Sequence, residues 1–193
     1  IDTGGATDNL TLNSAVSTAG GNANTITLTA DDHYAQNALT VSTVGANVAI
    51  SAGRTLTASG SGGGAGSAIR TSGAASSMDT NGSDAGNIQL STSGANGGSI
   101  SVLGHLTAQG SSGNAGNTTA SNNATSGGRG GNVSVTTATA GAGIAITGNV
   151  LANGGNGSGG GTNFAWMFGT GGNGGSVTLR NTGNSGAGSI SVG

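Results

Sequence analysis

Two aspartates and a histidine stand side by side in the segment ADDHY, where they could bind a metal ion. Carboxylate oxygens and imidazole nitrogens are ordinary ligands of divalent cations, which makes Asp31, Asp32 and His33 candidates for a calcium or transition-metal site. A calcium site wants further carboxylates, and Asp79 and Asp84 fall in a different segment. Because aspartate is also a common turn residue, we expect a polar turn between two strands here, and no cofactor.

Catalysis would need a different set of side chains. Enzymes that cleave polysaccharides line a cleft with several acidic or basic residues. This chain has no Lys and no Glu, and its six Asp are spread along its length. His105 stands beside Leu106 where we expect a solvated turn. We therefore expect no catalytic residue and no enzyme, and keep a polysaccharide-active β-helix enzyme only as an alternative.

Three of the four aromatic residues lie in one short stretch, TNFAWMFGT. An extended backbone would place alternate residues of this stretch on one side. They could cover the small-residue wall of the same molecule. Alternatively they could contact a neighbouring fibre or a ligand, because Trp and Phe are typical interface anchors. The candidates for partner contact are Phe164, Trp166, Met167 and Phe168.

The composition excludes several classes of protein. The net charge is −2 and only 5% of residues are charged, whereas phosphate binding needs clustered Lys and Arg, so we expect no nucleic-acid partner. No apolar run approaches the roughly 20 residues of a membrane span. Leu, Ile, Val and Phe together number only 31 of 193 residues, and Gly numbers 43. Such a chain needs an architecture with a thin core.

Repeated segments within the sequence indicate what this architecture is. The segments ISAGRTLTASG (50–60), ISVLGHLTAQG (100–110) and IAITGNVLANG (144–154) share one pattern of apolar and small residues. Stacking these copies on one another would place their apolar residues in columns inside the molecule. The expected columns contain Ile50, Ile100, Ile144 and Ile190, and Leu56, Leu106 and Val150.

A second repeated element aligns without gaps. GNIQLST (86–92), GNVSVTT (131–137) and GSVTLRN (175–181) are separated by 45 and then 44 residues. Apolar and polar residues alternate within each copy, which indicates a strand with one buried face. The expected core positions are Ile88 and Leu90, Val133 and Val135, and Val177 and Leu179.

Strands that bury two side chains each cannot fold as isolated units. Copies stacked at the ~4.8 Å strand spacing can, because each strand then pairs with its equivalent above and below. We predict an all-β fold, a parallel β-solenoid (β-helix) of about four to five right-handed coils, with long Gly/Ser/Asn-rich loops at one corner. An antiparallel sandwich is the rival, but gapless copies favour stacking of like on like.

The predicted organisation is a single module over residues 1–193. Its repeats are expected at approximately 1–43, 44–87, 88–132, 133–176 and 177–193, the last one incomplete. The chain begins with Ile rather than Met, and we expect it to be a segment of a longer fibre.

The segments GGSISVLGHLTAQG (97–110), GGNVSVTT (130–137), AGIAITGNVLANGG (142–155) and ITLTADD (26–32) carry a resemblance to a known family. The pattern resembles the Gly-rich β-solenoid repeats of large secreted bacterial exoproteins and adhesins of the filamentous haemagglutinin type. The resemblance implies secretion, a bacterial cell-surface or extracellular location, a long rigid shaft, and a role in attachment or matrix. It implies no catalytic residue.

These observations predict a structural segment of an extracellular filament or fibrous adhesin. Its partners would be neighbouring copies or the continuing chain, stacked on exposed coil ends. The alternative is an adhesin binding module whose loops contact a host or matrix glycan or protein.

Overall fold

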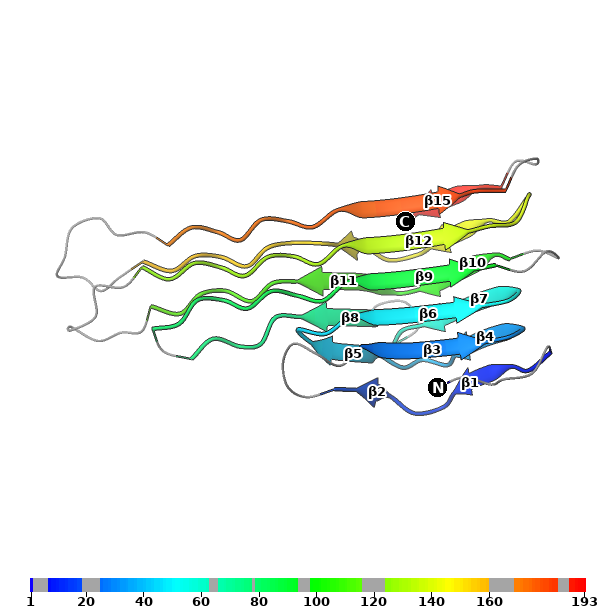
Figure 1. Ribbon diagram of the computed structural model, residues 1–193, viewed down its shortest axis with the longest axis horizontal. Coiled ribbons are helices and arrows are strands. Elements are labelled where there is room, and N and C mark those ends of the chain that lie inside the picture. Colours follow the sequence, from blue (N-terminus) through cyan, green and yellow to red (C-terminus); the bar gives the residue numbers. More distant parts are fainter. Residues whose placement is uncertain are drawn as a thin grey trace.

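The computed structural model describes residues 1, 7–18, 25–62, 66–77, 79–93, 98–115, 124–159, 169–183 and 188–193. Within these residues the chain forms sixteen strands and no helix. The strands make three parallel sheets, and successive strands along the chain pass from one sheet to the next (Figure 1). The predicted parallel β-solenoid is therefore confirmed, with about five coils.

Each sheet collects every third strand. The first sheet contains β1 (Leu10–Leu12), β4 (His33–Gln36), β7 (Thr55–Ser59), β10 (Ile100–Leu103), β13 (Ile144–Ile146) and β16 (Ile190–Val192). The second contains β2 (Val16–Ser17), β5 (Val41–Val44), β8 (Ser67–Ser72), β11 (His105–Gln109) and β14 (Val150–Leu151). The third contains β3 (Ile26–Ala30), β6 (Val48–Ala52), β9 (Ile88–Thr92), β12 (Val133–Thr137) and β15 (Val177–Asn181). We number the coils from one (β1–β3) to five (β13–β15).

The core is a thin column enclosed by the three sheets. Inward positions of the inner strands are fully buried, as at Leu56, Leu90 and Leu106, and Thr, Ser or Gln occupies many of the outward positions between them. Buried threonines line the corner between the second and third sheets. Thr43 and Thr71 each donate a hydroxyl hydrogen bond to a backbone carbonyl of that corner, which satisfies polar groups that burial would otherwise leave unpaired.

Two of the expected columns are wrong in their first residues, Ile50 and Leu56, which lie in other columns. Ile50 lies in the third sheet, between Leu28 and Leu90, and not beneath Ile100. Leu56 pairs with Ile100 in the first sheet. The residues expected above Leu56, namely Leu106 and Val150, belong to the second sheet.

The reason is a change in coil length. Tyr34 pairs with Leu56, 22 residues further on, whereas Leu56 pairs with Ile100, and Ile100 with Ile144, each 44 residues further on. The first two coils are therefore about half as long as the next three. The segment 50–60 resembles the later copies because any two consecutive strands share the same alternation. The predicted repeat 1–43 consequently spans more than one coil.

The remaining expected positions share columns in the structure. In the third sheet, Ile88 pairs with Val133 and Val133 with Val177, and the same register aligns Leu90, Val135 and Leu179. In the first sheet, Ile144 pairs with Ile100 and Ile190, and in the second sheet Leu106 pairs with Val150.

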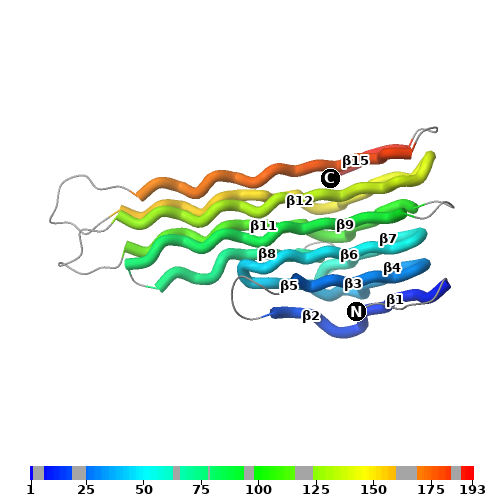
Figure 2. The backbone as a smooth tube through the Cα atoms, in the orientation of Figure 1, coloured from blue at the N-terminus to red at the C-terminus, as the bar shows by residue number. Residues whose placement is uncertain are grey.

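The extra length of coils three to five lies between the second and third sheets. In each coil an outgoing leg leaves the second sheet and a returning leg enters the third. The legs are wavy and lie side by side beyond the sheets (Figure 2). The described outgoing legs are 73–77, 110–115 and 152–159, and the returning legs are 79–86, 124–131 and 169–175.

Hydrogen bonds join the legs at every third residue. Within the returning layer, Gly127 and Gly130 donate their N–H groups to carbonyls of the next leg up, those of Thr170 and Asn173. Bonds between the two layers run from Gly128 to Ser111, from Gly155 to Gly128 and from Gly172 to Gly155. A repeat of three residues per turn, with backbone hydrogen bonds to neighbouring segments and not within the segment itself, is typical of the polyproline II helix. The legs thus form a two-layer slab, and the predicted loops are regular structure over these residues.

In the returning leg of coil four, glycine is required at two positions of each triplet, whereas other legs carry side chains at some equivalent positions, as at Ser83 and Ser111. A Cβ on Gly127 would meet a carbonyl of the other layer at 2.0 Å, and a Cβ on Gly128 would meet the Ser83 carbonyl of the leg below at 2.0 Å. Only the third position points outward and tolerates a side chain, as at Arg129. This explains the triplets of SGGRGGN (126–132) and TGGNGGS (170–176).

Outward side chains of the slab satisfy backbone groups of the next leg. The Asp84 carboxylate accepts the Arg129 N–H at 2.6 Å, and the Asn87 side-chain oxygen accepts the Asn132 N–H at 2.8 Å. Asn132 in turn accepts the Ser176 N–H at 2.9 Å. Short polar side chains at the third position therefore have a structural role, because each one pairs an N–H that the slab itself leaves free.

Candidate functional surfaces

The turn between β3 and β4 holds the candidate metal ligands. An Asp32 carboxylate oxygen lies 2.8 Å from Nε of Arg54, and the other lies 3.5 Å from Nε2 of His33. The described part of the chain contains no group of three or more His, Cys, Asp or Glu side chains placed to hold a metal ion. Asp32 instead fastens coil two to coil three through Arg54, in a polar turn at the surface.

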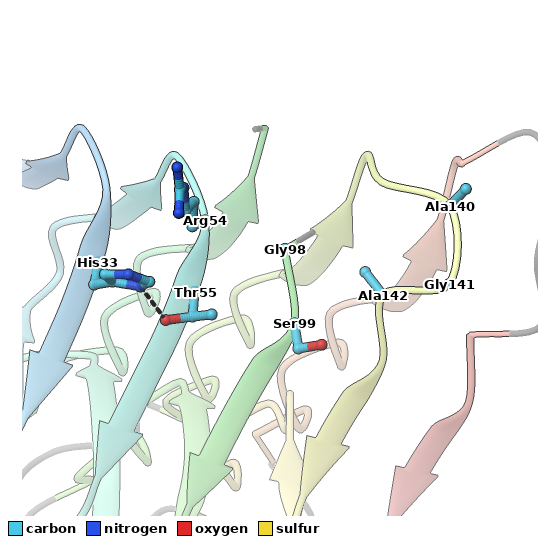
Figure 3. Close-up of a pocket in the computed structure, with 8 residues that line it drawn as sticks. All are labelled: His33, Arg54, Thr55, Gly98, Ser99, Ala140, Gly141 and Ala142. Carbon is cyan, nitrogen blue, oxygen red and sulfur yellow. Dashed lines mark hydrogen bonds between the residues drawn. The ribbon is translucent and has the colours of Figure 1, made fainter. Parts of the chain in front are cut away.

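A groove of ≈ 380 Å³ lies beside this turn, at the corner between the third and first sheets (Figure 3). Coils two and three line it with His33, Arg54 and Thr55, coil four with Gly98 and Ser99, and coil five with the turn residues Ala140, Gly141 and Ala142. At this corner, the turns that lead into coils two and three have two residues each. The turn that leads into coil five is longer and consists of residues 138–143, with Gly141 at φ 76°. The groove is the step that this difference in turn length leaves.

One arrangement in the groove has the order of a catalytic triad. Nδ1 of His33 lies 2.6 Å from the Thr55 hydroxyl, and Asp32 lies on the other side of the imidazole. A nucleophile, a base and an orienting carboxylate follow each other in the same way in hydrolases. Here the carboxylate is closer to Arg54, at 2.8 Å, than to the imidazole, at 3.5 Å. We therefore assign these contacts to fastening the corner.

The four aromatic-loop candidates for partner contact, Phe164, Trp166, Met167 and Phe168, lie outside the described residues. The legs on either side of them, 152–159 and 169–175, belong to the slab. Partner contact through these side chains stays a prediction from the sequence.

The C-terminal end of the stack exposes core positions. Val177, Ile190 and Val192 are 46%, 46% and 49% exposed, while their column neighbours in the coil below, among them Val133 and Ile144, are each 1% exposed. Exposed coil ends are expected from the sequence, and this end presents three apolar side chains to solvent.

The N-terminal end differs. Leu28, Leu12 and Ile26 in coil one are only 1%, 7% and 8% exposed. Ile1 extends the third sheet at this end, since its amino group donates to the Thr27 carbonyl and its carbonyl accepts the Thr29 N–H, at 2.8 and 2.9 Å. The apolar positions of coil one are therefore largely covered.

Sequence reasoning missed two features of these surfaces. It did not pair Asp32 with Arg54, because that contact depends on the short second coil. It did not identify the slab, although the triplets GGR, GGN and GGS carry its period of three.

Comparison with family models, with curated proteins and with solved structures gave no match for this chain. The fold and the geometry of these surfaces are therefore the basis for a functional proposal. Within the described residues no helix is long and apolar enough to cross a membrane.

Proposed function

We propose that the chain is a structural segment of an extracellular filament or fibrous surface adhesin, in which stacked β-coils form a rigid shaft. One observation carries this proposal: three parallel sheets run through the whole stack, with five or six strands each and matching strands in register. Each inner strand is hydrogen-bonded on both sides, so bending the stack would break backbone bonds in more than one sheet.

The mechanism is mechanical. The apolar columns exclude water from the sheets, and the slab widens each long coil with a second hydrogen-bonded layer beside them (Figure 1). Only 5% of the residues are charged, so ion pairs that salt would screen, such as Asp32–Arg54, are a small part of the contacts between coils. Its cohesion comes from backbone hydrogen bonds and apolar contacts.

The extracellular location and the bacterial source are proposed from the resemblance of the repeats to secreted exoproteins. The same resemblance leaves room for an adhesin binding module. The aromatic cluster in TNFAWMFGT favours that second function, because it interrupts an otherwise polar, Gly-rich segment with typical contact residues. Replacing 160–168 with a Gly/Ser segment of equal length should abolish adhesion and spare the stack if the second function holds.

Electron microscopy of the native material tests the shaft. Filaments or elongated shafts are the expected result, and particles without any elongated form would contradict the proposal. Leu90→Asp is a suitable negative control, because it places a charge at a fully buried core position and should remove the filaments by unfolding the stack.

A further inference from the structure

Polar side chains tie consecutive coils together at the corners and along the slab. In each of these contacts, a side-chain oxygen accepts the backbone N–H of the residue that stands at the equivalent place one coil up. The donor and acceptor residues are His33 and Asn9, Asn87 and Asn47, Ser126 and Asn81, Arg129 and Asp84, Asn132 and Asn87, Gly143 and Ser99, Asn156 and Ser112, and Ser176 and Asn132. Each acceptor atom must offer a lone pair to the N–H group.

His105 makes the same kind of contact with a ring nitrogen. Its Nδ1 accepts the Asn149 N–H at 2.8 Å, and Asn149 stands one coil above it, since Leu106 pairs with Val150. A backbone N–H only donates, so Nδ1 carries no proton and the neutral ring holds its proton on Nε2. The contact therefore requires a neutral imidazole, because the imidazolium ring is a donor at both nitrogens.

The imidazole nitrogen is packed against the turn above it. Gly148 is buried, and a Cβ on it would lie 2.7 Å from Nδ1 of His105. A proton on Nδ1 would point at the Asn149 N–H, so the turn would have to move away or the ring would have to rotate. The strand that follows this turn, β14, has only two residues. A change at Asn149 thus affects a large part of the pairing between β14 and β11.

The charged groups around this imidazole are few. The described segments that form this corner in coils three to five are 60–62, 66–72, 100–109 and 144–151. Arg70 is the one charged side chain within them, and it lies opposite Thr107 in the register of β8 and β11. The terminal carboxylate belongs to Gly193, which stands one coil further up, beside Thr147. Because Arg70 is a cation, these segments offer an imidazolium no ion pair that would offset the lost hydrogen bond.

Mild acid distinguishes His105 from the other acceptors. Imidazole is the side chain whose ordinary pKa, about 6.5, falls between pH 5 and 8. Amide and hydroxyl oxygens take up no proton in this range, and carboxylates take one up near pH 4. His33, the other histidine of the chain, has its Nδ1 beside the Thr55 hydroxyl. A hydroxyl accepts as well as donates, so that contact survives protonation.

We propose that His105 is an acid-sensitive fastener between coils four and five, whose protonation releases the Asn149 N–H and loosens the start of β14. The contact is complete while the imidazole is neutral and is lost as the pH falls through the titration of the ring. The contacts made by side-chain oxygens persist, so the loosening is confined to the corner between the first and second sheets. The inference does not depend on the shaft function.

Amide hydrogen exchange followed by NMR tests this in the unaltered protein. The protection factor of the Asn149 amide, which corrects for the intrinsic effect of pH on exchange, should fall about three- to tenfold from pH 7.5 to pH 5, as expected for the loss of one hydrogen bond. The Asn132 amide is the internal control and should keep its protection, because its acceptor is the Asn87 side-chain oxygen. Unchanged protection of Asn149 while the His105 ring resonances show protonation would overturn the inference.

His105→Asn replaces the ring nitrogen with an acceptor that does not titrate. Asparagine already fills this role at Asn47, Asn87 and Asn132, so the variant should retain the Asn149 contact and show no loss of protection in acid.

His33→Gln is the matched control and should retain the acid loss at Asn149. An acid loss that persists in His105→Asn, or one that disappears in His33→Gln, would assign the effect to another group and reject the fastener. Microscopy tests the shaft separately, so an acid loss at Asn149 without filaments would reject only the shaft.

Discussion

At the residue scale, the slab needs glycine because neighbouring legs lie too close to leave room for a Cβ atom. The conformational freedom of the glycine backbone is not the reason. The glycines that face a neighbouring leg have no room for a methyl group, and the described exceptions are at the edges. Gly172 and Gly171 make the contrast within one leg: a Cβ would meet a carbonyl oxygen at 1.9 Å on Gly172 and at 3.6 Å on Gly171. Adjacent glycines therefore differ in their tolerance of alanine.

Gly172→Ala should lower the free energy of unfolding by about 1–3 kcal/mol, because the leg must move away from Gly128 to accommodate the methyl group. Gly171→Ala, the matched control, should change it by less than about 1 kcal/mol. Urea denaturation of both variants measures the difference. Equal effects would show that the legs are not packed as a slab.

Tyr34 is the other residue with a distinct physical role. Its side chain is 1% exposed in coil two and donates a hydrogen bond to the Gln36 side chain at 3.0 Å. Gln36 is equally buried and donates to the carbonyls of Leu39 and Ala68. Burial raises the pKa of Tyr34 above its ordinary value of about 10, because the charged phenolate would lose its hydration.

The raised pKa predicts alkaline destabilisation. The folded state keeps Tyr34 protonated while the unfolded state releases the proton above pH 10, so this contribution to stability is complete below pH 10 and is lost as pH rises further. The loss approaches about 1.4 kcal/mol per pH unit. Tyr34→Phe should cost about 1–3 kcal/mol at pH 8, since it leaves the Gln36 oxygen unpaired, and should remove the alkaline loss.

Denaturation from pH 8 to pH 11.5 checks this, with tyrosinate absorbance as a direct reading of ionisation. The chain has one Tyr and no Lys, so few other groups titrate in this range. Parallel pH curves for the two proteins would contradict the assignment.

At the element scale, the contribution of a strand to the free energy of unfolding depends on whether neighbouring strands cover it on both sides. Val133 and Val177 are paired neighbours in one column, yet Val133 is 1% exposed and Val177 is 46% exposed. Val133→Ala should cost about 2 kcal/mol, from lost burial and the cavity left behind. Val177→Ala should cost about 0.5 kcal/mol or less. Equal losses in urea denaturation would indicate that the last coil is covered.

Elements also show how far the sequence predicts this structure. The columns of the third sheet follow from three gapless copies, because equal spacing and alternation fix both the face and the register of a strand. Ile50 and Leu56 were misplaced because alternation alone does not tell one sheet from another. The coils have two lengths, and the strand pairing reveals which coils are short. Tyr34 pairs with Leu56 across a short coil, and Leu56 pairs with Ile100 across a long one.

The candidate site was predictable in part. Aspartate composition identified a turn at Asp31 and Asp32, but the partner, Arg54, reaches Asp32 only because coil two is short. The slab is not predicted from glycine content alone, because Gly-rich segments are usually irregular loops. A period of three in Gly-Gly-x triplets is the pattern that predicts ordered legs.

At the scale of the whole molecule, the stack is a one-dimensional array in which each coil contacts its neighbours. Strands β14 and β15 of coil five lie at sheet edges, as β1 and β2 do, but coil five exposes its apolar position Val177 whereas coil one buries Leu12 and Ile26. Unfolding by force applied to the two termini should therefore begin at coil five and proceed coil by coil. Each long coil, of 44–46 residues in the first-sheet register, should release about 150 Å of chain.

The two short coils, of 22 and 24 residues, should release only about 75–80 Å each. Single-molecule force spectroscopy should therefore record three long steps followed by two short ones. Four steps of similar length and one shorter step at the C-terminal end would restore the repeats expected from the sequence, and one step of full length would show that the coils do not unfold separately. The order of the steps matters as much as their size, because long steps come first only if the exposed C-terminal coil is the weakest point of the stack.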